Sequence, residues 1–151
     1  MNKLVSESLY EFQRGQEPKE TLKIGGEYEK VKSWLSQFLY KSQWKLNEDW
    51  TIDIVRGDFI ASGEKIPEFP EFIQFNEVVR DFIVTGCDLE ILTGFPKRIQ
   101  GELIISDNKI MSLHGCPEYV GGDFAINRNK NEKFSEEGIR KVCEVGGKIY
   151  T

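Results

Sequence analysis

The amino-acid sequence predicts an α+β protein: a short β-solenoid of about five rungs with a parallel sheet, a helical N-terminal cap and one C-terminal capping helix. The first observation behind this prediction is a pattern that recurs about every 21 residues in the second part of the chain. The second is a non-repeating N-terminal part with apolar residues at helical spacing. We therefore divide the chain into a cap, residues 1–48, and a solenoid, residues 49–151, which includes a capping helix over residues 135–144.

The repeat is clearest when Asp81, Glu102 and Asp123 are aligned as position 1 of successive units. The alignment continues upstream to Asp58 after 23 residues and downstream to Lys148 after 25. The two complete units share glycine at positions 14 and 21 and proline at position 16, so accidental similarity is a poor explanation. Three further columns are Phe82, Leu103 and Phe124 at position 2, Val84, Ile105 and Ile126 at position 4, and Cys87, Asn108 and Asn129 at position 7.

Each unit reads L-x-L-x-x-N/C-x-L-x-x-L, which is the leucine-rich-repeat pattern. Positions 2 and 4 alternate along a short strand, so both side chains point into the coil. Positions 9 and 12 fill the same core from the return leg, and the side chain at position 7 can bond backbone groups of the turn. No unit can bury its apolar edge alone, so the units stack as rungs. A β-meander with accidentally similar units is the alternative.

The first 48 residues predict helices that cap the stack. One short helix is expected to end at Gly15, and a second to begin at Pro18 and stop before Gly25-Gly26. The segment from Trp44 to Asp53 then leads into the first strand. The apolar residues of the first helix are Val5, Leu9 and Phe12, and Leu22 lies in the second. A longer stripe at helical spacing, for which a partner-binding helix is the alternative to a cap, comprises Tyr28, Val31, Trp34, Leu35, Phe38 and Leu39.

The C-terminal part predicts one helix and a closing strand. Ser135 is a suitable N-cap, acidic residues follow it, and Gly146 is expected to stop the helix. Residues 148–151 are expected to complete the sheet. The side chains expected to face the last rung are Ile139, Val142 and Cys143.

Over almost its whole length, the chain resembles leucine-rich-repeat-like proteins of Bacteroidota and tailed phages. The resemblance rests on three stretches: residues 9–19, LYEFQRGQEPK; residues 113–124, LHGCPEYVGGDF; and residues 134–143, FSEEGIRKVC. It implies a binding scaffold and, in a phage protein, an inhibitor of a host defence enzyme. Two departures are Glu64 at position 7 of the first unit and Asn131 at position 9 of the fourth.

The charge distribution indicates the kind of partner. The chain has 20 basic and 25 acidic residues, of which residues 1–57 carry 9 and 9, leaving 11 basic and 16 acidic residues in 58–151. A field of this sign repels nucleic acid and favours a basic protein surface. No apolar run approaches the ~20 residues of a membrane span, and no signal peptide is expected. We expect a cytoplasmic protein, in the host cytoplasm if it is phage-encoded, that binds no membrane.

The sequence does not predict an enzyme. His114, the single histidine, occupies a loop position that Thr93 holds one unit earlier. Cys87, Cys116 and Cys143 are too far apart in sequence for a zinc motif, and they are expected to be small core residues. No nucleophile and base occur at a familiar spacing. We therefore expect no catalytic residue, no metal and no cofactor.

The surface with functional potential is the outer side of the predicted sheet, where positions 1, 3 and 5 would point. It combines carboxylates with an apolar row, which suits an interface. In the other explanation, Gly-Asp is turn chemistry of the repeat and isoleucine simply favours strands. The partner-binding residues that this surface predicts are Asp81, Ile83, Thr85, Glu102, Ile104, Ser106, Asp123 and Asn127.

These observations favour a non-catalytic protein-protein interaction module that is monomeric when free. The partner is expected to be another protein with a basic surface. The alternative is a structural or virion-associated protein that self-associates through the same face or through the N-terminal helix.

Overall fold

The structure is a computed structural model that describes residues 19–151, with side chains described from residue 26 onwards. The short helix expected on Val5, Leu9 and Phe12 and the helix start at Pro18 lie outside the described residues. No helix within residues 19–151 is long and apolar enough to cross a lipid bilayer.

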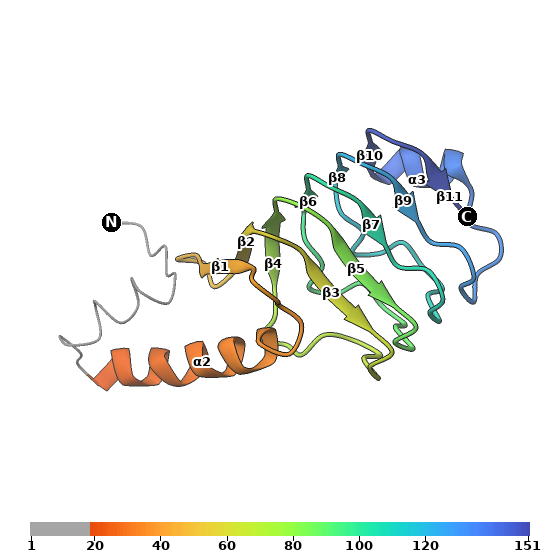
Figure 1. The fold of residues 1–151 in the computed structure, drawn as a ribbon. Coiled ribbons are helices and arrows are strands. Elements are labelled where there is room, and N and C mark those ends of the chain that lie inside the picture. Colours follow the sequence, from red (N-terminus) through yellow and green to blue (C-terminus); the bar gives the residue numbers. More distant parts are fainter. Residues whose placement is uncertain (1–18) are drawn as a thin grey trace.

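The chain coils into a parallel β-solenoid of about four turns, with a helix at each end (Figure 1). One sheet has five strands in the order β11-β9-β7-β5-β3, and the other has six in the order β1-β2-β4-β6-β8-β10. The five-stranded sheet comprises β3 (Phe59–Ser62), β5 (Phe82–Thr85), β7 (Leu103–Ile104), β9 (Phe124–Ala125) and β11 (Ile149–Tyr150). The six-stranded sheet comprises β1 (Gln43–Leu46), β2 (Ile52–Arg56), β4 (Phe75–Val78), β6 (Arg98–Ile99), β8 (Tyr119–Val120) and β10 (Glu144–Val145).

The register of the five-stranded sheet confirms the repeat alignment. Phe59 pairs with Phe82, Phe82 with Leu103, Leu103 with Phe124, and Phe124 with Ile149, all in parallel. These pairs reproduce the unequal spacings read from the sequence, and parallel pairing rules out the β-meander. The predicted inward residues at positions 2 and 4 of the three central rungs, from Phe82 to Ile126, are at most 1% exposed.

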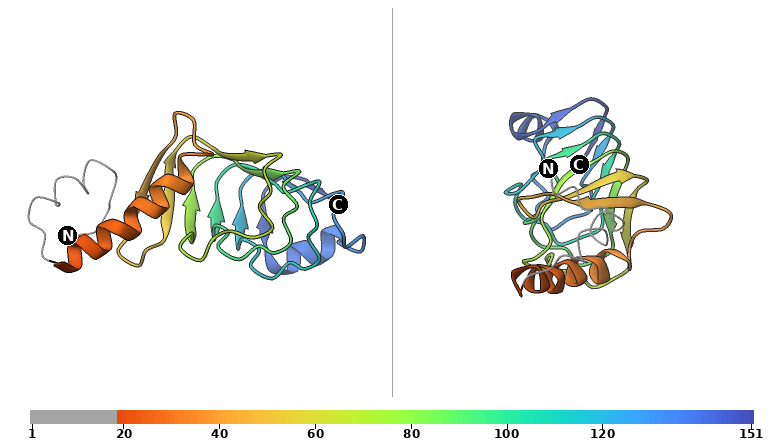
Figure 2. Two further views of the ribbon diagram at one scale, coloured as in Figure 1. Left: turned by 90° about the horizontal axis from the view of Figure 1, so that it is seen from below. Right: turned by 90° about the vertical axis from the view of Figure 1, so that its left-hand side faces the viewer.

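The six-stranded sheet was not predicted. Each turn of the chain passes from a strand of this sheet, around a corner, to a strand of the five-stranded sheet, and returns through a leg without strands (Figure 2). Strands β6, β8 and β10 bury one side chain each, namely Ile99, Val120 and Val145. A strand that buries one side chain has no period-two signal to detect.

The polar residues at position 7 bond backbone groups of the turn, as predicted, and these bonds also join neighbouring rungs. The Asn108 side chain accepts hydrogen bonds from Cys87 N and Leu89 N at 2.9 and 3.2 Å, and its amide group donates to Val84 O at 2.7 Å. Asn129 accepts a bond from Ile110 N one rung further along. These side chains satisfy backbone groups that the turn leaves without strand partners.

The N-terminal cap contains one continuous helix, α2 (Lys19–Leu35). The prediction of a helix end before Gly25-Gly26 was wrong, because the helix continues through both glycines into the apolar stripe. Tyr28, Val31 and Leu35 are at most 1% exposed, and the Trp34 ring lies 5.8 Å from that of Phe59 in the first rung. The burial that this packing provides outweighs the roughly 1 kcal/mol that a glycine costs inside a helix. The stripe therefore covers the open end of the stack.

The segment after α2 closes one edge of the five-stranded sheet. Phe38 O accepts a hydrogen bond from Ile60 N at 3.4 Å, and Ser42 Oγ donates to Asp58 O at 2.8 Å. The expected lead-in from Trp44 to Asp53 is a hairpin, in which β1 pairs antiparallel with β2 at the edge of the six-stranded sheet.

The C-terminal helix, α3 (Glu136–Val142), is shorter than predicted. Ser135 is the N-cap, and its hydroxyl accepts from Gly138 N at 3.0 Å, as expected. The helix ends at Cys143, whereas Gly146 lies beyond β10 and bonds to Val120 O, so Gly146 belongs to the repeat corner. The prediction that Val142 faces the last rung was wrong, because its side chain is 51% exposed. Ile139 and Cys143 are buried as predicted.

Candidate protein-binding face

The outer surface of the five-stranded sheet carries one apolar side chain from every rung, at position 3. Ile60 and Tyr150 at its two ends are 48% and 47% exposed, and the three side chains between them are half-buried. Parallel pairing aligns these residues, with neighbouring rungs about 4.8 Å apart. We call this set the apolar row: Ile60, Ile83, Ile104, Ala125 and Tyr150.

Position 5 forms a polar row beside the apolar row. The Thr85 hydroxyl donates to Ser62 Oγ at 3.4 Å, and the Ser106 hydroxyl donates to Asn127 Oδ1 at 2.6 Å. Ser106 is only 5% exposed, so its prediction as a partner-binding residue is not supported by its position. Thr85 and Asn127 remain half-buried at the outer surface.

Position 1 carries the four predicted carboxylates Asp58, Asp81, Glu102 and Asp123, which we call the acidic column, and Lys148 occupies the same position in the last rung. Asp58 Oδ1 accepts from Asp81 N at 2.9 Å, and Asp81 Oδ1 accepts from Glu102 N at 2.8 Å. Asp123 Oδ1 likewise accepts from Lys148 N at 2.8 Å. Three of the four carboxylates therefore hold the next rung in register.

The glycine that directly precedes position 1 makes room for the carboxylate of the previous rung. A Cβ atom on Gly101 would collide with Asp81 Oδ1, and one on Gly147 would collide with Asp123 Oδ1. These glycines and the aspartates of the previous rung therefore build the corner of the repeat, as the turn explanation of the Gly-Asp pattern expects.

Most carboxylates of the acidic column have no ion-pair partner among the residues with described side chains. Asp58 forms an ion pair with Arg80, in which Nε and Oδ1 are 3.5 Å apart. Within residues 26–151, no ion pair involves Asp81, Glu102 or Asp123. Hydrogen bonds to backbone N–H groups do not neutralise a carboxylate, and these side chains are half-buried at the surface. The apolar row is therefore bordered by negative charge.

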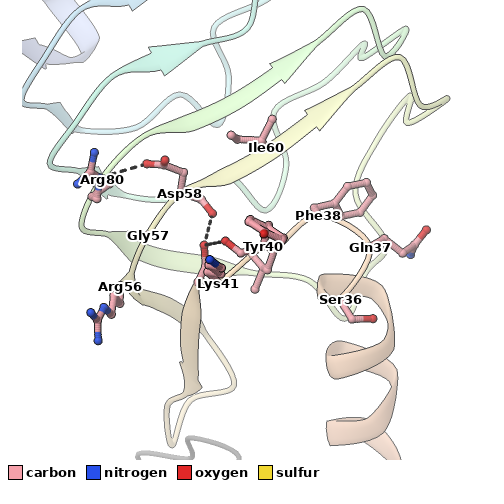
Figure 3. A pocket seen from close by; sticks show the side chains of 12 residues that line it. Ser36, Gln37, Phe38, Tyr40, Lys41, Arg56, Gly57, Asp58, Ile60 and Arg80 are labelled. Carbon is pink, nitrogen blue, oxygen red and sulfur yellow. Dashed lines mark hydrogen bonds and ion pairs between the residues drawn. The ribbon is translucent and has the colours of Figure 1, made fainter.

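A hollow of about 850 Å³ lies at the N-terminal end of the apolar row (Figure 3). It is lined by residues 36–42, by the corner between β2 and β3, and by Ile60 and Arg80. Lys41, Arg56 and Arg80 supply three positive charges to its lining, against one negative charge from Asp58. Its size is within the range of small-ligand and side-chain pockets.

The sequence did not indicate this hollow. Its residues come from the α2–β1 connection, from the first corner and from the next rung, and only Asp58 and Ile60 belong to repeat columns. In the structure, Lys41 has a positive φ of 59°, which is uncommon for a residue other than glycine. The sequence does not reveal this conformation.

The residues considered for catalysis or metal binding are His114 and the three cysteines. His114 is exposed on a return leg, where its backbone N–H bonds to Ser112 Oγ. Cys87 is fully buried, and burial raises its pKa. Cys116 and Cys143 are neighbours in adjacent turns, and their hydrogen bond raises the pKa of Cys116 and lowers that of Cys143. In the part of the chain with described side chains, no three potential metal ligands gather at one point.

Comparisons with protein-family models, with curated proteins and with solved structures find no match to this chain. The assignment of the fold as a solenoid therefore rests on the strand register and the buried side chains of this chain. A proposal for its function rests on its surfaces.

Proposed function

We propose that this protein is a non-catalytic interaction module that binds another protein through the outer face of its five-stranded sheet. The observation that carries the proposal is the apolar row, which is aligned across five adjacent strands and open to solvent at Ile60 and Tyr150. An aligned exposed apolar row with a polar and acidic border has the composition of an interface.

The outer face of the six-stranded sheet provides the contrast. Its aligned residues Glu77, Arg98, Tyr119 and Glu144 are polar or amphipathic. The Arg98 guanidinium lies 4.3 Å from the centre of the Tyr119 ring, and the Gln100 amide donates to the Glu77 carboxylate at 2.6 Å. These side chains already interact with one another, which favours the five-stranded sheet as the binding face.

The partner surface that best fits the acidic column is basic. Asp81, Glu102 and Asp123 would attract lysine or arginine side chains at the border of the apolar contact. Inhibition of a host defence enzyme, which the family resemblance implies, is a narrower form of this proposal.

The test begins with affinity capture from the native host and identification of the captured protein by mass spectrometry. Binding of that purified protein is then measured calorimetrically against the wild-type chain and against Ile83→Lys combined with Ile104→Lys. Two lysines in an apolar contact are expected to weaken binding at least about 100-fold, because central interface residues contribute about 2 kcal/mol or more each.

A matched control introduces two lysines outside the proposed binding face. Ile91 and Met111 are 44% and 56% exposed on return legs, and Ile91→Lys combined with Met111→Lys is expected to leave binding within about threefold of wild type. Equal binding by the Ile83/Ile104 variant and the wild type, with both chains folded, would reject the proposal.

Self-association through the same face is the second candidate, since an apolar row can pack against its own copy. Bringing two such faces together also brings two acidic columns near each other, which costs energy. Sedimentation of the purified chain at increasing concentration distinguishes the two: a constant monomer mass supports binding of a different protein, whereas a dimer that the Ile83/Ile104 variant dissociates supports self-association.

A further inference from the structure

The hollow at the N-terminal end of the apolar row has a charge opposite to that of the acidic column. Three cationic side chains and one carboxylate line it, so its lining has a net charge of +2. Asp58 already accepts a hydrogen bond from Asp81 N and pairs with Arg80. Among the residues with described side chains, Lys41 and Arg56 have no carboxylate partner.

The same hollow has apolar walls. Phe38, Tyr40 and Ile60 contribute to its lining, and Figure 3 shows Phe38 at the end of the lining opposite Arg56 and Arg80, with Ile60 between them. Tyr40 is 82% exposed, and Lys41 Nζ lies 5.4 Å from the centre of its ring. A ligand that fits both parts carries an anionic group next to an apolar or aromatic group.

Backbone geometry holds this hollow in shape. Gly57 has a φ of 86°, and a Cβ there would approach Ser42 Oγ to 2.5 Å, so the corner and the residues after α2 lie in close contact. Ser42 Oγ also donates to Asp58 O at 2.8 Å, and Phe38 O accepts from Ile60 N. A preformed site of this kind binds without ordering a loop first.

Ile60 belongs both to the wall of the hollow and to the apolar row. A protein segment that lies along the row therefore reaches the hollow without a gap. We propose that the hollow binds an acidic segment of the partner protein, with a glutamate or aspartate carboxylate at Lys41 and Arg56 and a neighbouring aromatic side chain at Tyr40 and Ile60. This inference rests on the proposed function, because it assigns a second contact to the same interface.

The charge pattern distinguishes this occupant from nucleic acid. A phosphate chain that continued from the hollow along the sheet would meet Asp81, Glu102 and Asp123, which repel it. A protein segment can instead carry acidic residues at one end and basic residues further along. The positive hollow would then bind the acidic end of the segment, and the acidic column would bind its basic residues. This arrangement fixes the direction of the bound segment.

The test titrates the full chain with the peptide acetyl-Phe-Glu-Glu-Phe-amide. Binding is monitored through the chemical shifts of the backbone amides in NMR spectra. We expect the largest shifts at Lys41, Gly57 and Ile60, and at least tenfold weaker binding of the same peptide with glutamine in place of glutamate. Raising the salt concentration is expected to weaken the binding of the acidic peptide, because the attraction is ionic and exposed.

Two double substitutions test whether the peptide binds in the hollow. Lys41→Gln combined with Arg56→Gln is expected to weaken peptide binding at least tenfold, while Lys97→Gln combined with Lys130→Gln, at exposed positions outside the hollow, stays within about twofold of wild type. Amide shifts elsewhere in each variant show that its fold is intact. Equal binding of the glutamate and glutamine peptides, shifts centred away from the hollow, or a response to inorganic phosphate or single-stranded DNA as strong as to the acidic peptide would overturn the inference.

Two results separate this inference from the proposed function. Ile83→Lys combined with Ile104→Lys is expected to retain peptide binding in the hollow, because neither residue lines it. If the captured partner binds the wild type and the Lys41/Arg56 variant equally, the hollow is not a partner contact, although the sheet face remains one.

Discussion

Asn108 connects two neighbouring rungs through its side chain. Its buried side chain makes five hydrogen bonds to backbone groups, accepting from Cys87 and Leu89 and donating to Val84, Ile105 and Ser106. We expect Asn108→Ala to lower the free energy of unfolding by roughly 3 kcal/mol, because several backbone groups lose their partner in the interior. Urea denaturation checks this, with the exposed Glu132→Ala as a control expected to stay within about 0.5 kcal/mol. A loss no larger than that of the control would contradict the role given to position 7.

Asp107 and Arg128 form an exposed ion pair between neighbouring rungs, with Nη2 donating to Oδ2 at 2.9 Å. The hydrogen bonds from the Arg128 guanidinium hold the pKa of the Asp107 carboxyl below its ordinary value. The folded pKa is lowered, so the pair's contribution to stability is present above the ordinary carboxyl pKa and is lost as the pH falls through the lowered value. We expect an NMR titration to show the low pKa, and Arg128→Gln to raise it towards the ordinary value. An unchanged pKa in that variant would contradict the pairing.

At the scale of elements, α2 shows how packing overrides a local stop signal. Gly26 lies in the helix interior, and a Cβ built on it meets no atom within 4 Å. We expect Gly26→Ala to raise the free energy of unfolding by about 0.5–1 kcal/mol, because alanine has the higher helix propensity and clashes with nothing. Thermal or urea unfolding measures the change. No gain would indicate that the helix ends near Gly26, as the sequence had predicted.

Substitution of Trp34 tests whether α2 caps the solenoid. Its ring lies 4.7 Å from that of Phe38, 5.2 Å from that of Phe69 and 5.8 Å from that of Phe59, so it bridges the helix and the first rung. We expect Trp34→Ala to lower the free energy of unfolding by about 3 kcal/mol, within the range for large aromatic truncations. Lys30→Ala on the exposed side of α2 is the control. Equal stability of the two variants would show that the helix does not close the stack.

At the scale of the whole molecule, the repeat columns determined how much of the fold could be predicted. Phe82, Leu103 and Phe124 recur at the same position with a buried residue two places later, and this periodicity predicts strands, register and inward faces together. The six-stranded sheet has no comparable signal, because its short strands bury few residues each. The course of α2 and the end of α3 depend on tertiary packing that local glycine signals do not report.

The sequence predicted the part of the candidate site that lies in repeat columns. Ile83 and Ile104 occupy a repeat column, so their place on the outer face followed from the alternation of the strand. The burial of Ser106 and the hydrogen bonds of the acidic column depend on contacts between rungs, which a single unit does not contain. Lys41 and Arg56 precede the first repeat unit, and Arg80 occupies none of the shared columns, so only folding brings the three side chains to one hollow.

The claim on which the functional account depends is that the outer face of the five-stranded sheet is the contact surface. Cross-saturation NMR on the complex with the captured partner measures this directly, because saturation passes only to amides close to the bound protein. The account predicts strong attenuation at Ile60, Ile83 and Ile104, and little at Arg98 and Tyr119 on the six-stranded sheet. Attenuation confined to Arg98, Tyr119 and their neighbours would contradict it.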